Sequence, residues 1–75
     1  MNLTQLKEGE KCKVVDILGG GIMIKRLDAL GIRISKEITK INMQFLRGPV
    51  IVQVDNSQIA IGFGMADRII VEPVS

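Results

Sequence analysis

The sequence predicts one small, mostly β domain with about five short strands and one short helix between the first two. A chain of 75 residues leaves room for a single domain, because at this length only about 60% of the unfolded surface can be buried. Apolar residues make up 47% of the chain and are mainly Ile, Val and Leu, which favour pleated strands over long helices. Short apolar runs separated by turn-forming residues recur throughout, so residues 1–75 are treated as one unit.

The first strand is expected from about Glu10 to Leu18, after a helical turn whose N-cap we assign to Thr4. Its apolar positions change from even to odd numbers between Val14 and Val15, which indicates a bulge or a strong bend. Glycines at positions 19–21 end this strand, because residues without Cβ lose too much entropy inside a ladder.

The single helix is expected over Ile22 to Leu30, where Met23, Leu27 and Leu30 recur at helical spacing and form one stripe. Gly31 follows as a left-handed stop. A helix of about two and a half turns is too short to be stable alone, so this one must dock on the sheet.

The remaining strands are expected from apolar alternation bounded by turn residues. A change of phase between Ile38 and Ile41 indicates a second bend, and Gly62 and Gly64 break the strand before them. The expected strands are Lys36–Met43, a hairpin of Pro49–Val54 and Gln58–Ile61 turning at residues 55–57, and Arg68–Glu72, which Pro73 ends. Five short strands and one helix fit a small SH3-like barrel, because closure removes the exposed edges of a short sheet.

The residue content argues against an enzyme. Histidine is absent, which removes the commonest general base and the commonest transition-metal ligand. Cys12 is the only cysteine, so we expect it to pack in the core, and a lone thiol suits a reducing compartment. The eight carboxylates are spread singly along the chain. We therefore expect no catalytic residues, no bound cofactor and no metal ligands, while a site made of oxygen ligands alone stays open as an alternative.

Anion and nucleic-acid binding find little support. The three glycines precede a helix, as in phosphate-binding loops, but the dinucleotide and Walker patterns are both missing, so we interpret them as a flexible connector. The net charge is only +2, and Phe45 and Phe63 are the only aromatic residues. Small barrels that bind nucleic acids usually combine a basic groove with several stacking aromatics, so no nucleic-acid partner is expected and a nucleic-acid-binding barrel is kept only as an alternative.

The location is expected to be cytoplasmic. No basic start with an apolar core marks a signal peptide at the N-terminus. The longest uncharged stretches fall well short of the roughly 20 apolar residues that span a membrane, so we expect a protein that is not inserted in one.

Binding of another protein is the function that remains. Phe45, Leu46, Arg47 and Gly48 look like a hairpin tip, where an apolar pair beside an arginine can anchor a partner or, alternatively, fold over the barrel as a lid. Lys25 and Arg26 add basic groups on the exposed side of the helix, although small charged clusters are usually just solvated. The apolar residues that alternation places in loops or on the outer side are Ile34, Phe45, Leu46, Ile51, Phe63, Met65 and Ile70, and weak self-association through Ile51 or Ile70 is a further option.

The order of motifs resembles the ferrous iron transport protein A (FeoA) family over nearly the whole chain. The motifs are Leu3–Leu6 with Gly9, Gly19–Gly20, the R-L-x-x-L-G-I-R segment at residues 26–33, Gly48–Val50, Ile59–Ile61 and Ala66–Ile69. The resemblance implies an SH3-like barrel in the bacterial cytoplasm that is an accessory to the ferrous iron permease, a membrane protein with a GTPase domain. It also extends to the C-terminal domain of regulators of the diphtheria toxin repressor class, which keeps a metal-sensing role as an alternative.

This chain departs from the family pattern at two places. The family commonly has Pro-Gly after Gly-Ile-Arg, where Ile34 and Ser35 stand here, so a different turn geometry is expected. An arginine that often follows the Ile-Ala-Leu strand is replaced by Gly62, which removes any contact it would make. We therefore expect a non-enzymatic module that docks on the cytoplasmic, GTPase-containing part of the permease and modulates it, with any link to Fe(2+) being indirect. The candidate contacts are Phe45, Leu46 and Arg47 on the hairpin tip, with Lys25 and Arg26 on the exposed helix face.

Overall fold

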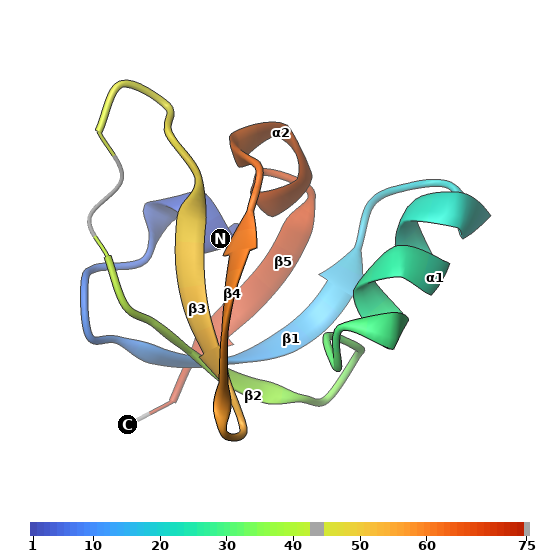
Figure 1. The fold of residues 1–75 in the computed structure, drawn as a ribbon. Coiled ribbons are helices and arrows are strands. Elements are labelled where there is room, and N and C mark those ends of the chain that lie inside the picture. Colours follow the sequence, from blue (N-terminus) through green and yellow to red (C-terminus); the bar gives the residue numbers. More distant parts are fainter. Residues whose placement is uncertain (43–44, 75) are drawn as a thin grey trace.

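The chain folds into one curled antiparallel sheet with a helix beside it (Figure 1). The computed structural model describes residues 1–42 and 45–74. Its elements are η1 (Leu3–Gln5), β1 (Lys11–Ile17), α1 (Gly21–Ala29), β2 (Glu37–Lys40), β3 (Val50–Val54), β4 (Ser57–Ile61), α2 (Phe63–Ala66) and β5 (Ile69–Pro73). The strand order is β4-β3-β2-β1-β5, so β4 and β5 form the two edges of a sheet that does not close. The prediction of a mostly β, SH3-like fold with about five strands and one helix between the first two is confirmed.

The bend expected in the first strand is confirmed as a bulge. The register of β1 against β5 shifts between Val14 and Asp16. Val14 and Ile17 are therefore both buried, although they differ in parity. Because of the bulge, side chains at even-numbered positions before it and at odd-numbered positions after it face the core.

The hairpin of β3 and β4 also follows the prediction. Val50, Val52 and Val54 are buried along one face of β3. The turn at residues 55–56 joins the pair Val54 and Ser57, and Asp55 has a positive φ of 53°. Aspartate tolerates this backbone region better than most residues, so the turn residue suits its place.

The second strand differs from the prediction. It ends at Lys40, and the predicted end at Met43 lies outside the described residues. Ile38 and Lys40 both point inward, so no change of phase occurs before Ile41. The prediction was wrong because it assumed that an inward position must be apolar, whereas a buried lysine continues the inward face.

The helix is present, but one of its three stripe residues is not in the core. Leu27 is buried and Met23 packs partly against the core, whereas Leu30 is 44% exposed and Ile32 is buried after it. Gly31 has a φ of +87°, which confirms the left-handed stop. This turn swings the chain inward at Ile32, so the core contact that the helical spacing assigned to Leu30 is made two residues later.

The N-terminal turn is capped by a different residue from the one predicted. Asn2 is the N-cap of η1, and its Oδ1 accepts a hydrogen bond from the Thr4 backbone N–H at 2.9 Å. The Gln5 Oε1 accepts from the Asn2 backbone N–H at 2.8 Å and completes a capping box. Leu3 and Leu6 are thereby turned into the core.

The turn at Ile34 and Ser35 keeps the geometry that the family's Pro-Gly would give, so the expected change of geometry was wrong. The Lys36 N–H donates to the Arg33 carbonyl at 3.0 Å, and Ser35 has a φ of +78°. A positive φ at the third residue defines a type II turn, which favours proline and glycine at its two central positions. A further hydrogen bond holds Ser35 there, since its N–H donates to the Val14 carbonyl at 2.7 Å.

Cys12 lies in the core, as predicted. Its side chain is fully buried among the apolar residues that β1, β2, β3 and β5 contribute. Burial and, to a smaller extent, the nearby Glu10 carboxylate raise the pKa of the thiol from 9.0 to about 11. A thiol that stays protonated at neutral pH is a weak nucleophile, so Cys12 serves packing.

Candidate functional site

The loop before β3 presents two fully solvated apolar side chains. Phe45 is 80% and Leu46 is 86% exposed, so neither folds over the core as a lid. Leu46 and Arg47 have φ values of 52° and 59°, and the Gly48 N–H donates to the Phe45 carbonyl at 3.0 Å. Positive φ at both central residues is the pattern of a type I′ turn, which Asn and Gly normally occupy. We call residues 45–48 the tip.

The backbone of the tip is strained at two consecutive positions. A left-handed conformation costs a residue with Cβ about 1–2 kcal/mol. Both Leu46 and Arg47 carry this cost, which persists only where the surroundings hold the conformation. Strain of this kind concentrates at binding sites, so the tip is the first candidate for a functional surface.

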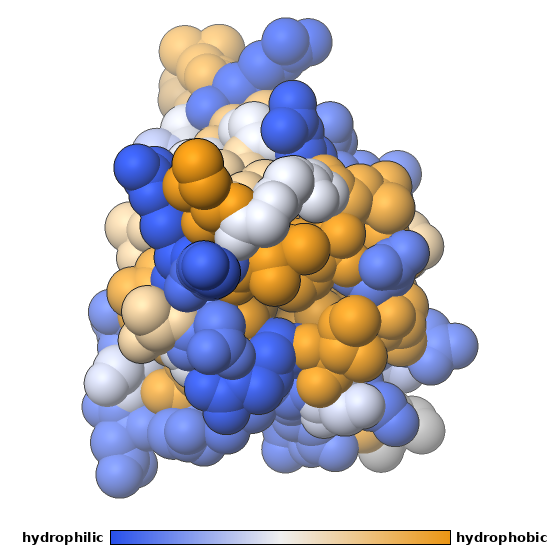
Figure 2. All heavy atoms as spheres, turned by 90° about the vertical axis from the view of Figure 1, so that its right-hand side faces the viewer, coloured by the Kyte–Doolittle hydropathy of each residue, from blue (hydrophilic) through white to orange (hydrophobic). Residues whose placement is uncertain are grey.

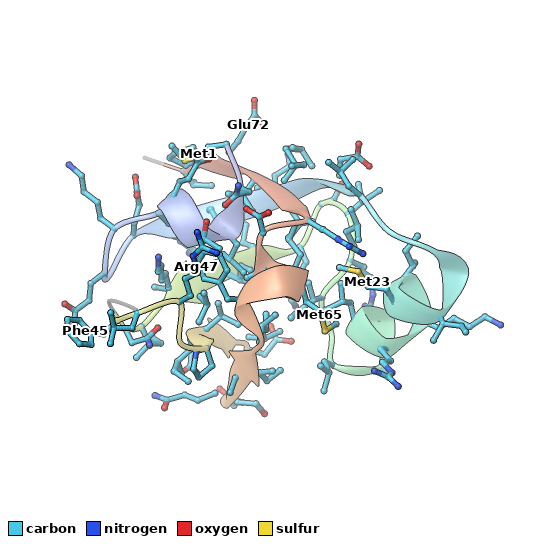
Figure 3. The ribbon with its side chains drawn as sticks, turned by 90° about the horizontal axis from the view of Figure 1, so that it is seen from above. Met1, Met23, Phe45, Arg47, Met65 and Glu72 are labelled. Carbon is cyan, nitrogen blue, oxygen red and sulfur yellow. The ribbon has the colours of Figure 1, made fainter. Side chains whose placement is uncertain are left out.

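Side-chain contacts fix the base of the tip. The Asn42 Nδ2 donates to the Pro49 carbonyl at 3.0 Å, and its Oδ1 accepts from the Ile51 N–H at 2.7 Å. The Arg47 guanidinium lies over the Phe63 ring, with 5.8 Å between its central carbon and the ring centroid. This cation–π contact connects the tip to α2, and Figure 3 shows Arg47 directed from the loop toward that helix.

The two basic residues predicted on the helix are exposed but lie far from the tip. The tip and α1 are on opposite sides of the molecule (Figures 1 and 3). Lys25 borders a groove of about 500 Å³ between α1 and β1, whose walls include Ile24 and Ile34. Arg26 borders a different hollow, of about 380 Å³, beside α2. The five predicted contact residues therefore do not form one patch.

Sequence reasoning missed an apolar surface around α1. Ile22 is 77% exposed, and Ile24, Leu30 and Ile34 are also exposed. In the space-filling view of this side, apolar side chains form adjoining areas among hydrophilic ones (Figure 2). The available signal was that Ile22 and Ile24 fall outside the stripe of the helix that faces the core. The other outer-side candidates, Ile51, Phe63, Met65 and Ile70, are half-buried.

Sequence reasoning also missed the buried charge of Lys40. Its ammonium donates to the Thr4 carbonyl at 3.0 Å and to the Leu6 carbonyl at 2.7 Å. Burial lowers the pKa of Lys40 below its ordinary value, and the Glu10 carboxylate opposes this effect. Lys40 therefore fastens the N-terminal segment to β2. No local pattern marks this role, because both acceptors are backbone atoms more than thirty residues away.

Among the described residues, the charged groups form ion pairs and do not gather into a metal site. Within residues 1–42 and 45–74, no group of three or more Cys, Asp or Glu side chains could hold a metal ion. The ion pairs described are Lys11 with Glu37 at 3.4 Å, Arg33 with Asp28 at 2.8 Å and Lys36 with Asp55 at 2.7 Å. Exposed pairs of this kind contribute little to stability, about 0–1 kcal/mol each. None of the helices in the described part of the chain is long and apolar enough to cross a membrane.

The fold is that of small SH3-like domains, and the comparisons with known proteins specify the family. Among solved structures, the crystal structure of an iron uptake regulatory protein (FeoA) superposes with a TM-score of 0.91 at 31% identity, covering 99% of this chain and 97% of the other. A manganese regulator, SloR, superposes with a TM-score of 0.85 at 15% identity, covering 99% of this chain and 34% of the regulator, which supports the fold alone.

Sequence comparisons agree with the structural ones. A protein of Methanocaldococcus jannaschii named "Putative Fe(2+) transport protein A" is 42% identical over 66 residues, which are 88% of this chain and 78% of the relative. The family model described as "FeoA domain" matches residues 1–73. This chain therefore belongs to the FeoA family, as the motif order indicated, and is associated with Fe(2+) transport.

Proposed function

We propose that this protein is a non-enzymatic accessory of ferrous iron uptake that docks, in the cytoplasm, on the GTPase-containing part of the ferrous iron permease and modulates it. The observation that carries the proposal is the tip, where Phe45 and Leu46 are solvated and held by a strained turn. Apolar side chains on a rigid turn lose little entropy on binding, so they suit a pocket on a partner. The membership in the FeoA family supplies the transport system as the partner.

The basic residues of α1 supply a second, electrostatic contribution. Lys25 and Arg26 are exposed, and neither is in an ion pair within the described ranges. Charges at the rim of an interface mainly speed association and set its salt dependence. Because the tip and α1 lie on opposite sides, a partner that binds both must contact the domain from two sides.

Titration of the chain with the isolated cytoplasmic domain of the permease tests the proposal. We expect a dissociation constant below about 100 μM, as for other transient complexes. Phe45→Ser and Leu46→Ser should each weaken binding about tenfold, since exposed apolar anchors account for most of the energy of such contacts. Leu18→Ser is the matched control, because Leu18 is also exposed and apolar but lies between β1 and α1.

Two results would overturn the proposal. One is the absence of binding at about 100 μM with a domain shown to bind nucleotide. The other is equal loss of affinity in the Leu18 variant and the tip variants. Modulation is measured separately, as the rate of GTP hydrolysis by the permease domain with and without the chain.

A further inference from the structure

The edge strand β4 has backbone groups that face solvent. The Ile51 N–H donates to Asn42, and the Ile51 carbonyl accepts from the Ile41 N–H at 2.8 Å, so both groups of Ile51 point toward β2. Ala60 is the partner of Ile51 on β4, and the N–H and C=O of Ala60 therefore point away from β3. Gln58 lies two residues earlier and points the same way. Throughout residues 1–42 and 45–74, no hydrogen bond occupies these groups.

This edge lacks the features that normally prevent strand pairing. Edge strands are commonly protected by charges, prolines, bulges or a covering segment. The other edge, β5, carries Glu72 and Pro73 and is partly covered by Met1 and Asn2. By contrast, residues 56–66 contain no charged residue and no proline, and the register of β4 is regular. An unprotected edge of this kind is a template for an added strand.

A groove lies where the side chains of an added strand would point. It has a volume of about 470 Å³ and separates β4 from the C-terminal end of α1. Leu30 lies in one wall, and Ile59 and Val54 belong to the other. The charged residues at its border are in ion pairs, Asp28 with Arg33 and Asp55 with Lys36. Alternate residues of a strand paired with β4 would enter this groove, because side chains alternate between the two faces of a sheet. The helical spacing does not explain why Leu30 is exposed, but in this groove its side chain would contact those of an added strand.

The end of β4 leads to a positively charged hollow. This hollow of about 380 Å³ is bordered by Met23 and Met65, with Arg26 and Arg68 among its other walls. Figure 3 shows Met23 and Met65 near one another between α1 and α2. In the described part of the chain, neither arginine pairs with a carboxylate. Two unpaired guanidinium groups beside flexible thioethers suit an acidic side chain next to an apolar one.

We propose that β4 binds an extended segment of a partner protein by strand addition, with the segment's apolar residues in the groove beside Leu30 and an acidic residue between Arg26 and Arg68. This inference goes beyond docking on the permease and does not depend on it, although Arg26 belongs to both surfaces. The specificity expected is an acidic residue at one end of an alternating apolar segment.

A second copy of this chain fits the edge less well. Pairing of β4 with its own copy would bring together two uncharged segments, residues 56–66. The flanking carboxylates already have partners, since Asp55 pairs with Lys36 at 2.7 Å and Asp67 accepts from the Asn2 Nδ2 at 3.0 Å. A strand of five residues also offers less contact than the roughly 1,000 Å² that a stable protein interface buries. The complementary charge therefore has to come from another protein.

Selection of a random heptapeptide library displayed on phage, with the purified chain as bait, tests the inference. We expect enriched peptides that alternate apolar and polar residues and carry Asp or Glu at one end. A synthetic enriched peptide titrated into ¹⁵N-labelled chain should shift the amide signals of Gln58 and Ala60 most. The inference is overturned if no peptide is enriched, or if the shifts centre on the tip or on the groove at Lys25.

Variants of β4 and Arg68 distinguish strand addition from nonspecific peptide binding. Ala60→Pro removes one outward N–H without removing a bond to β3, and should weaken the peptide about tenfold, whereas Ala60→Ser keeps the donor and should stay within about twofold. Arg68→Glu should weaken it by a similar factor and also tests the inference if the proline variant does not fold. Equal affinity in all three variants would contradict the inference. Self-association of the free chain that shifts the same amides would identify a second copy as the occupant and overturn it too.

Discussion

The two edge strands of the sheet differ in whether another segment covers their outward backbone groups. On the β5 edge, the Val71 N–H donates to the Met1 carbonyl at 2.8 Å, and Asn2 forms a bridge with Ile70. The same N-terminal segment continues into η1, and the carbonyls of Thr4 within η1 and of Leu6 directly after it accept hydrogen bonds from the Lys40 ammonium. On the β4 edge, the described residues place nothing over Gln58 and Ala60.

The difference separates stability from recognition. A buried ammonium is costly unless it is hydrogen-bonded, and this chain uses its buried lysine to close one edge. The open edge exposes backbone groups, although Ile61 of β4 is in the core, and the strained tip exposes apolar side chains. We call the β5 edge, with the N-terminal segment and Lys40, the closed side, and the β4 edge with the tip the open side. Substitutions on the closed side should lower the free energy of unfolding. Substitutions on the open side should relieve backbone strain but weaken binding.

Lys40→Ala should have the largest effect, because it opens the closed side. The substitution removes the buried stem and leaves the Thr4 and Leu6 carbonyls without this donor, so we expect a loss of about 3–4 kcal/mol in the free energy of unfolding. Lys40→Met restores the stem alone and should recover about half of this loss. Chemical denaturation measures it, with the exposed Lys13→Ala as control. A Lys40→Ala variant as stable as the native chain would show that Lys40 does not stabilise the closed side.

Cys12 should make the closed side sensitive to alkaline pH. The pKa of the thiol is about 11 in the folded chain, against an ordinary value of 9.0. Below pH 9 the thiol is neutral in both states, so its contribution is fully present. Between pH 9 and about 11 only the unfolded chain ionises, and the free energy of unfolding falls by up to about 3 kcal/mol.

Cys12→Ala isolates this effect from other titrating groups. The variant should lose about 1 kcal/mol at neutral pH through the smaller side chain, and the difference from the native chain should shrink or reverse as the pH rises past 9. Urea denaturation at several pH values measures both curves. A difference that stays constant across that range would show that the thiol is not buried as described.

Leu46→Asn should stabilise the open side while weakening its binding. Asparagine adopts a positive φ more easily than leucine, so the free energy of unfolding should rise by about 1 kcal/mol. The same change removes one apolar anchor, and affinity for the permease domain should fall. Thermal unfolding and titration on one preparation measure both effects. A variant that is more stable and binds equally well would exclude Leu46 as a contact.

Ser35→Gly should have the smallest effect and serves as the counterpart of the tip variant. It relieves a positive φ in the turn before β2, and the gain of about 0.5 kcal/mol is limited by the added freedom of glycine in the unfolded chain. Because Ser35 belongs to neither the tip nor the β4 edge, binding should not change. If affinity falls here as well, strain relief anywhere in the domain, and not loss of contacts, would explain the tip variant.

Most of the fold could be predicted from the sequence because local rules determine it. The bulge in β1, the β3–β4 hairpin and the stop at Gly31 each follow from a short pattern of apolar or turn residues. Lys40 could not be predicted, because its inward position breaks the apolar pattern and its acceptors are distant in sequence. Long-range hydrogen bonds of this kind leave no mark on neighbouring residues.

The candidate surfaces were predicted only in part. The place of Phe45 and Leu46 in a tip between strands could be predicted, but their exposure could not, because a lid over the core was the alternative. The groove between Leu30 and Ile59 arises where α1 meets the β4 edge, and the hollow between Arg26 and Arg68 arises where α1 meets α2. Such surfaces depend on how separate elements pack, and no periodicity within one element specifies that packing.

The pairing of β1 with β5 has a consequence for how the chain acquires its fold. β1 needs a neighbour formed by residues 69–73, from Cys12 opposite Pro73 to Ile17 opposite Ile69. Contacts between such distant positions slow folding, because a long loop must close before they form. During synthesis on the ribosome, β1 emerges early and must wait without this partner until residues 69–73 have been made. The domain therefore completes its sheet only after these residues have emerged, and not strand by strand.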